Sequence, residues 1–138
     1  MMLRRISVLS AAMVLLAAAM PVHADDSAII NRWYMALLAA DRAGLSDLLS
    51  EDARINLVDL DIEQNKQEFI DSMGEWEAAA EGGTIRHRIE KSEDGVSTVI
   101  ACYDFPGNDM LMQETFAVAD NRITASSQAI VAETCDGY

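Results

Sequence analysis

Glu114 is the residue whose surroundings point most directly to chemistry. Alternation along this segment places it on one face of a predicted strand with Met112 and Phe116. Burial among apolar groups raises the pKa of a carboxyl, so a buried Glu114 could remain protonated and act as a hydrogen-bond donor or general acid. The alternative is a polar group at the rim of a pocket, solvated or paired with an arginine.

His87 is the second candidate. It alternates with Ile85 and Ile89, which places it on the buried side of a predicted strand. An imidazole ionises near neutral pH, so His87 is the natural general base of this chain. The alternative is a core histidine that bonds a backbone carbonyl or a neighbouring acid. If Glu114 and His87 face one cavity, they form a coupled acid–base pair, but the sequence leaves the distance between them open.

Large apolar and aromatic residues on the inward sides of the expected elements could line a pocket for a flat, apolar ligand. Residues of these types at such spacings also build ordinary cores, and this alternative stays open. The residues expected in the lining are Trp33, Tyr34, Leu57, Trp76, Val99, Tyr103, Met112 and Phe116.

Helices are expected in the first half of the chain. Apolar residues recur at helical spacing over 25–40, and a shorter helix is expected over 42–50. A capping box, with Asn65 at the cap and Glu68 three residues later, opens a third helix that ends at Gly82.

The second half changes to a period of two, which is typical of strands. Turns rich in Gly, Asn and Asp separate the strands, and such short connections favour antiparallel pairing. Strands are expected over 84–90, 96–105 and the two halves of 111–130, after an earlier one near a sheet edge over 54–61. The predicted fold class is α+β, with about three N-terminal helices on one face of a curved antiparallel sheet.

The N-terminus reads as a secretory signal peptide. Arg4 and Arg5 precede an apolar run over 6–19, and small residues lead to Ala24. We therefore expect residues 1–24 to be removed and residues 25–138 to form a single periplasmic or secreted domain. The alternative is an uncleaved anchor. Once cleaved, the chain has no segment that would hold it to a membrane.

Charge narrows the classes of partner. Loss of Arg4 and Arg5 leaves eight basic residues against 23 acidic ones, a formal charge of −15. Such a chain is a poor binder of nucleic-acid phosphates. The acidity favours cationic ligands or partners, although a solvated acidic surface is the simpler interpretation.

Cys102 and Cys135 are the two cysteines, and an even count in an exported chain suggests one disulfide. The bond would close a loop of 34 residues and attach the C-terminal tail to the sheet. Free thiols are the alternative, because bonding geometry cannot be read from spacing. We expect no metal site and no cofactor, since the chain has neither paired-cysteine spacing nor a glycine-rich phosphate or dinucleotide motif.

The order helix, short helix, strand, helix and then a run of strands resembles the nuclear transport factor two superfamily, also called SnoaL-like or ketosteroid-isomerase-like. The likeness covers nearly all of residues 25–138 and marks the chain as similar to an exported bacterial member. It implies a cone-shaped sheet wrapped around the helices, with an apolar pocket at the open end. The matching stretches are 30–37 with Asp41, 48–53, 68–70, 114–116 and 120–123.

The resemblance also allows a comparison with the isomerase branch. The branch's anion-stabilising acid matches Glu114. Its helix tyrosine falls at Trp33, with Tyr34 one residue away and expected to be rotated off that face. Its proton-transferring aspartate falls at Leu57, and Asp59 is the nearest acid on that strand face. Two of three positions differ, which argues against steroid-type isomerase chemistry.

The function that these observations favour is non-catalytic binding of a small, largely apolar molecule in an internal pocket. One alternative is a lyase, isomerase or hydrolase that uses His87 and Glu114. A second alternative is a protein-interaction module, because the resemblance implies that the outer face of the sheet could form a homodimer.

Overall fold

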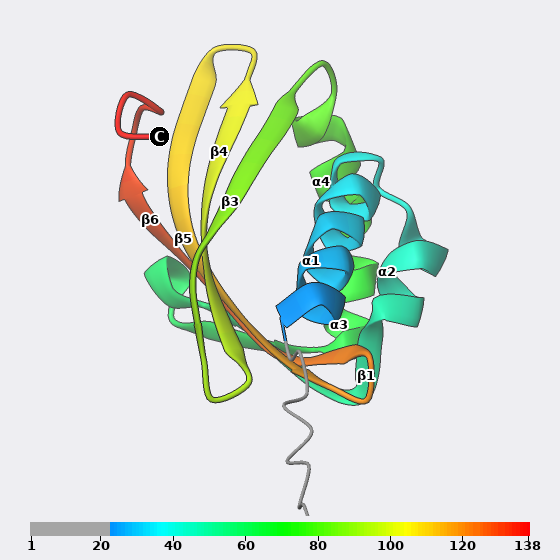
Figure 1. The fold of residues 1–138 in the computed structure, drawn as a ribbon. Coiled ribbons are helices and arrows are strands. Elements are labelled where there is room, and N and C mark those ends of the chain that lie inside the picture. The colour runs from blue at the N-terminus through cyan, green and yellow to red at the C-terminus, as the bar shows by residue number, and fades with distance from the viewer. Residues whose placement is uncertain (1–22) are drawn as a thin grey trace, which may run out of the picture.

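A computed structural model describes residues 23–138, and most of the expected signal peptide lies outside the described residues. The helices of this part of the chain all precede its last four strands, as expected from the sequence (Figure 1). The helices are α1 (His23–Leu38), α2 (Arg42–Leu48), α3 (Lys66–Asp71) and α4 (Met73–Ala80), with a 3-10 turn η1 (Val58–Leu60). The strands are β1 (Leu49–Leu57), β2 (Ile62–Asn65), β3 (Thr84–Glu93), β4 (Val96–Phe105), β5 (Asn108–Ala119) and β6 (Arg122–Ala132).

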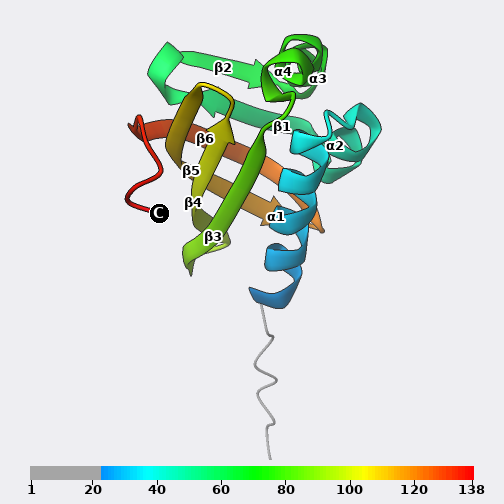
Figure 2. The ribbon, with the colours of Figure 1, turned by 90° about the horizontal axis from the view of Figure 1, so that it is seen from above.

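The strands form one sheet in the order β2-β1-β6-β5-β4-β3. All neighbouring pairs are antiparallel except β1 and β6, which run parallel. The sheet bends so that its concave side faces the helices, and β6 carries the chain back to β1 (Figures 1 and 2). The predicted α+β class, helices on one face of a curved sheet, is therefore confirmed.

One edge strand, β2, has no counterpart among the expected elements. The strand expected near an edge is β1, which lies second from that edge, between β2 and β6, and the other edge strand is β3. β2 was not expected because it is short and mostly exposed, and its polar residues give no period-two signal. The prediction that the third helix is continuous is also wrong, since Ser72 separates α3 from α4 and its hydroxyl donates to the Phe69 carbonyl at 2.6 Å.

The start of α3 confirms the predicted capping box. The Asn65 side chain accepts from the Glu68 amide at 2.9 Å, and the Glu68 carboxylate accepts from the Asn65 amide at 3.2 Å. Two donors that the helix itself cannot satisfy are thereby paired. This cap fixes where the chain leaves β2 and enters the helices that pack over the sheet.

The core lies between α1 and the concave side of the sheet. Trp33 is fully buried, stacked on Phe69 with ring centroids 5.3 Å apart and edge-on to Phe116 at 5.9 Å. Such aromatic pairs add stability beyond the area they bury, about 1 kcal/mol each.

Within the described residues, no helix is both long and apolar enough to cross a bilayer.

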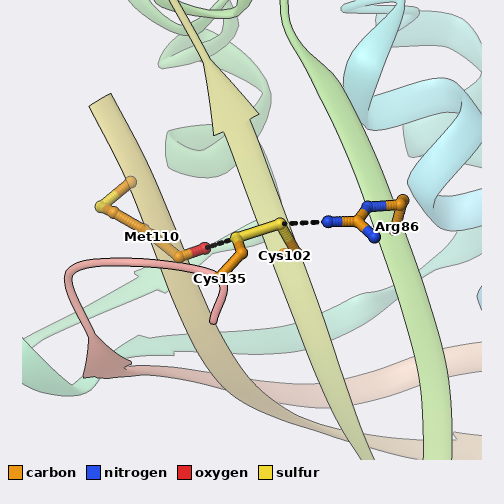
Figure 3. Close-up of a disulfide and its surroundings, with 4 residues drawn as sticks. All are labelled: Arg86, Cys102, Met110 and Cys135. Carbon is orange, nitrogen blue, oxygen red and sulfur yellow. Dashed lines mark hydrogen bonds between the residues drawn. A yellow bond between two sulfur atoms is a disulfide. The ribbon is translucent and has the colours of Figure 1, made fainter. Parts of the chain in front are cut away.

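The disulfide between Cys102 and Cys135 is formed, with Cα atoms 5.6 Å apart (Figure 3). It attaches the segment after β6 to the outer side of β4. The Tyr138 ring lies against the guanidinium groups of Arg86 and Arg88, whose central carbons are 4.8 and 4.7 Å from its centroid. The C-terminal tail is therefore attached to the sheet both by the disulfide and by the Tyr138 ring. The disulfide is consistent with an oxidising compartment.

Candidate ligand-binding site

Glu114 lies in the middle of β5 and is fully buried. Its Oε2 accepts a hydrogen bond from the Tyr34 hydroxyl at 2.8 Å, and its Oε1 accepts one from the Tyr103 hydroxyl. The two tyrosines come from α1 and β4, so a helix and a strand meet at this carboxyl. The alternative that Glu114 sits at a pocket rim, solvated or paired with an arginine, is wrong.

The environment of Glu114 changes its ionisation. Burial raises its pKa to about 7, and the hydrogen bonds from Tyr103 and Tyr34 lower the pKa only in part. Burial and the nearby carboxyl also raise the pKa values of Tyr34 and Tyr103, so both hydroxyls keep their protons. The group can change charge near neutral pH, but both carboxyl oxygens are already occupied by protein donors.

Tyr34 does not point away from the core as expected. It is 3% exposed, and its ring is edge-on to Phe116 at 5.9 Å. The expectation failed because α1 packs against the sheet on one side and α2 on the other, which buries a wider arc than one helical stripe. Trp33 is buried as well, but its indole N–H has no partner among the described residues. The hydroxyl donor therefore comes from Tyr34.

His87 lies elsewhere on the concave face. Its ring stacks on Tyr34, and it borders a shallow surface depression together with Asn31 and Arg88. Burial lowers the pKa of His87 below its usual value, so the imidazole is neutral at pH 7. β4 separates its strand from the strand of Glu114, which places the two backbones about 10 Å apart across the sheet. The structure thus joins the two candidates through Tyr34 and does not place them side by side.

A separate apolar cavity of about 370 Å³ lies between α4, β2 and η1 on one side and β4, β5 and β6 on the other. Its size is within the range of small-molecule sites. Apolar side chains dominate the wall, and Leu60 and Ile62 at its border are 65% and 45% exposed. The lining consists of Leu37, Leu57, Leu60, Ile62, Gln64, Ser72, Met73, Glu75, Trp76, Tyr103, Met110, Met112 and Gln128.

The predicted lining residues fall into two groups. Leu57, Trp76, Tyr103 and Met112 line the cavity. The indole N–H of Trp76 donates to the Leu37 carbonyl at 2.6 Å, which fixes this ring in the wall. The other four belong to the packed core where α1 meets the sheet and do not line the cavity, and they are Trp33, Tyr34, Val99 and Phe116.

Sequence reasoning missed several lining residues. Met110 shares a strand face with Met112, so alternation alone could have found it. Ile62 and Gln64 belong to β2, which had no recognisable pattern. Asp59, the acid nearest to the isomerase-like base position, is exposed and accepts from the Ile130 amide at 2.7 Å, outside the lining.

Tyr103 connects the cavity to the buried carboxyl. Its ring forms part of the wall, while its hydroxyl points away from the cavity to Glu114. A ligand in the cavity therefore meets a tyrosine ring whose hydroxyl proton is already donated to Glu114. Among residues 23–138, no group of three or more potential metal-ligating side chains is close enough to hold an ion.

A bent six-stranded sheet with α1 on its concave side is the cone fold of the nuclear transport factor two-like, ketosteroid-isomerase-like and SnoaL-like proteins. No known family matches the sequence, and no curated protein matches it. The likeness is therefore one of fold alone.

Three solved structures illustrate the likeness. IdmH from Streptomyces antibioticus, a candidate polyketide cyclase, has a TM-score of 0.64 at 17% identity over 79% of this chain and 93% of its own. The epoxide hydrolase/cyclase-like enzyme SalBIII of salinomycin pyran-ring formation gives 0.66 at 12% identity over 75% and 88%. A ketosteroid isomerase-like protein from Catenulispora acidiphila, solved with trimethylamine, gives 0.58 at 14% identity over 73% and 83%. The fold therefore hosts enzymes and small-molecule complexes alike.

Proposed function

We propose that the protein binds a small, largely apolar molecule in the cavity between α4 and the sheet, without chemically changing it. The observation that carries the proposal is the wall, which is built from leucine, isoleucine, methionine and aromatic side chains with few polar groups. Met73, Met110 and Met112 make that wall adaptable, because methionine is unbranched and changes shape easily.

The absence of a reaction is supported by how Glu114 is held. General acid catalysis requires the acid to lie within hydrogen-bonding reach of the reacting group. Glu114 is fully buried and gives both of its oxygens to Tyr34 and Tyr103, and it is not part of the cavity wall. In this arrangement the carboxyl positions two rings rather than a substrate.

Titration with a neutral fluorescent apolar probe, N-phenyl-1-naphthylamine, tests the proposal. We expect one saturable site, which Met110→Trp abolishes because the half-buried Met110 side chain lines the cavity and an indole would fill it. The matched control is Met35→Trp, since Met35 is 66% exposed on α1 and lies outside the lining. Equal melting temperatures exclude unfolding as the cause. Non-saturable binding, or equal binding by both variants, would refute the proposal.

A second candidate function is favoured by the raised pKa of Glu114. A carboxyl that titrates near pH 7 suits acid–base chemistry, and Tyr34 connects it to His87. On this alternative, a lyase, isomerase or hydrolase would lose turnover in His87→Ala and in Glu114→Gln while melting near the native temperature. Loss of stability in both variants, with no turnover to lose, favours the binding function.

A further inference from the structure

The charge of the cavity wall is negative. Glu75 is the only charged residue in the lining, and the other polar members are Gln64, Ser72 and Gln128. Among residues 23–138, no lysine, arginine or histidine lines the cavity. A ligand with a carboxylate, sulfate or phosphate group would therefore meet no opposite charge, and it would lose hydration on entering.

Glu75 has no cationic partner of its own. Four ion pairs form among residues 23–138, and none of them includes Glu75. It lies in the first turn of α4, exposed at the edge of the cavity, next in sequence to Trp76. Its charge is thus available to a ligand whose other end is buried in the wall.

The segment that borders the cavity adds to the negative field. Residues 58–64 carry Asp59, Asp61 and Glu63 and no basic residue. Only Glu63 is paired, with Arg54 at 3.9 Å, and both side chains are exposed. Like charges around an opening raise the local concentration of cations and repel anions.

Aromatic rings provide a second attraction for positive charge. Trp76 and Tyr103 meet edge to face in the wall, with centroids 6.0 Å apart. The faces of tryptophan and tyrosine attract ammonium groups, most strongly where water is partly excluded. Both rings line the same cavity as Glu75, so the aromatic wall and the carboxylate favour the same kind of ligand group.

From this juxtaposition we propose that the cavity selects cationic amphiphiles: an apolar chain or ring system lies among the methionines, and an amine or quaternary ammonium group lies at Glu75. The inference rests on the proposed binding function and adds the charge of the ligand. It assigns Glu75 as the residue that determines this specificity.

Three probes with the same eight-carbon chain test the charge preference by calorimetry at low ionic strength: octyltrimethylammonium, octanol and octanoate. We expect octyltrimethylammonium to bind about tenfold more tightly than octanol, and octanoate to bind most weakly. Added salt should reduce the difference in affinity between octyltrimethylammonium and octanol, because screening weakens interactions between exposed charges.

The variant Glu75→Gln should bring octyltrimethylammonium close to octanol in affinity, while octanol itself binds as before. The control Glu77→Gln removes the same charge from the same helix, outside the cavity lining, and should keep the preference. Equal affinities of the native protein for the cation and the alcohol would overturn the inference and leave the binding function intact. Retention of the preference in Glu75→Gln would overturn the role of Glu75. Failure of all three probes and of the naphthylamine would overturn the binding function itself.

Discussion

Tyr34 stacks on His87 with ring centroids 4.4 Å apart and planes inclined by 21°. The hydroxyl of the same ring donates to Glu114. The general base and the general acid suggested by the sequence are therefore both held by one phenol. A substitution of His87 or of Glu114 should therefore alter the position of the Tyr34 ring, which contacts both residues.

Replacing Glu114 with glutamine should change how stability depends on pH. The carboxyl has a pKa of about 7 in the fold and about 4.5 in the unfolded chain, so the folded protein binds more protons between these values. Its contribution to stability is therefore present below pH 4.5 and is lost as pH rises to 7, by an amount on the order of 3 kcal/mol. Denaturant unfolding at pH 5 and pH 8 should show this loss in the native protein and not in Glu114→Gln.

Glu90→Gln is the matched control for that comparison, because Glu90 is exposed on β3. It should keep the pH dependence of the native protein. The same pH slope in Glu114→Gln as in the native protein would show that the carboxyl is not protonated near pH 7.

Tyr34→Phe should raise the pKa of Glu114 further. The variant keeps the ring and its packing but removes one of the two hydroxyl donors that stabilise the carboxylate. The midpoint of the pH-dependent stability change should move upward, with a cost of about 1–3 kcal/mol at pH 8. Tyr138→Phe removes a hydroxyl from the tail, far from this network, and should leave the midpoint where it is.

His87 should titrate below its usual value. Burial disfavours the imidazolium, so the folded protein binds fewer protons than the unfolded chain near pH 6.5, and this group lowers stability as pH falls through that value. NMR titration of the imidazole measures the shift directly, because His87 is the only histidine after residue 24. A pKa above 6.5 would instead indicate an acidic partner.

Reducing the disulfide should destabilise the protein by about 3–4 kcal/mol, because Cys102 and Cys135 close a loop of about 34 residues in the unfolded chain. Urea unfolding with and without dithiothreitol measures the difference. The double variant Cys102→Ala/Cys135→Ala should resemble the reduced protein and should not respond to the reductant. A reductant effect that persists in this variant would show that the loss has another origin.

The sequence predicted most of the fold because its strongest patterns are local. The apolar run from Val96 to Phe105 marks β4 with the bounds that the structure has, and the capping box at Asn65 marks the start of α3. Neither signal depends on a distant contact, since an apolar run bounded by turn residues and a helix cap are both local features of the sequence. The helix–strand order followed from such signals.

The site was harder to predict because it depends on register between distant segments. Tyr34 and Glu114 are 80 positions apart, and their contact follows from how α1 lies across β5. Glu114 could be recognised as unusual within its own strand, but neither tyrosine donor could be assigned to it. The charge of the cavity was missed for a similar reason, because Glu75 on α4 shares the cavity with strand residues that lie far from it in the sequence.

The parallel pairing of β1 with β6 has a consequence for the order of folding. Ile55 is matched with Ser126, so a strand from the first half of the chain finds one of its two neighbours only near the C-terminus. Contacts between residues so distant in sequence slow folding, because a long loop must close before they form. The sheet can therefore be completed only after the last strand of the chain has been synthesised, and β1 keeps one unpaired side until then.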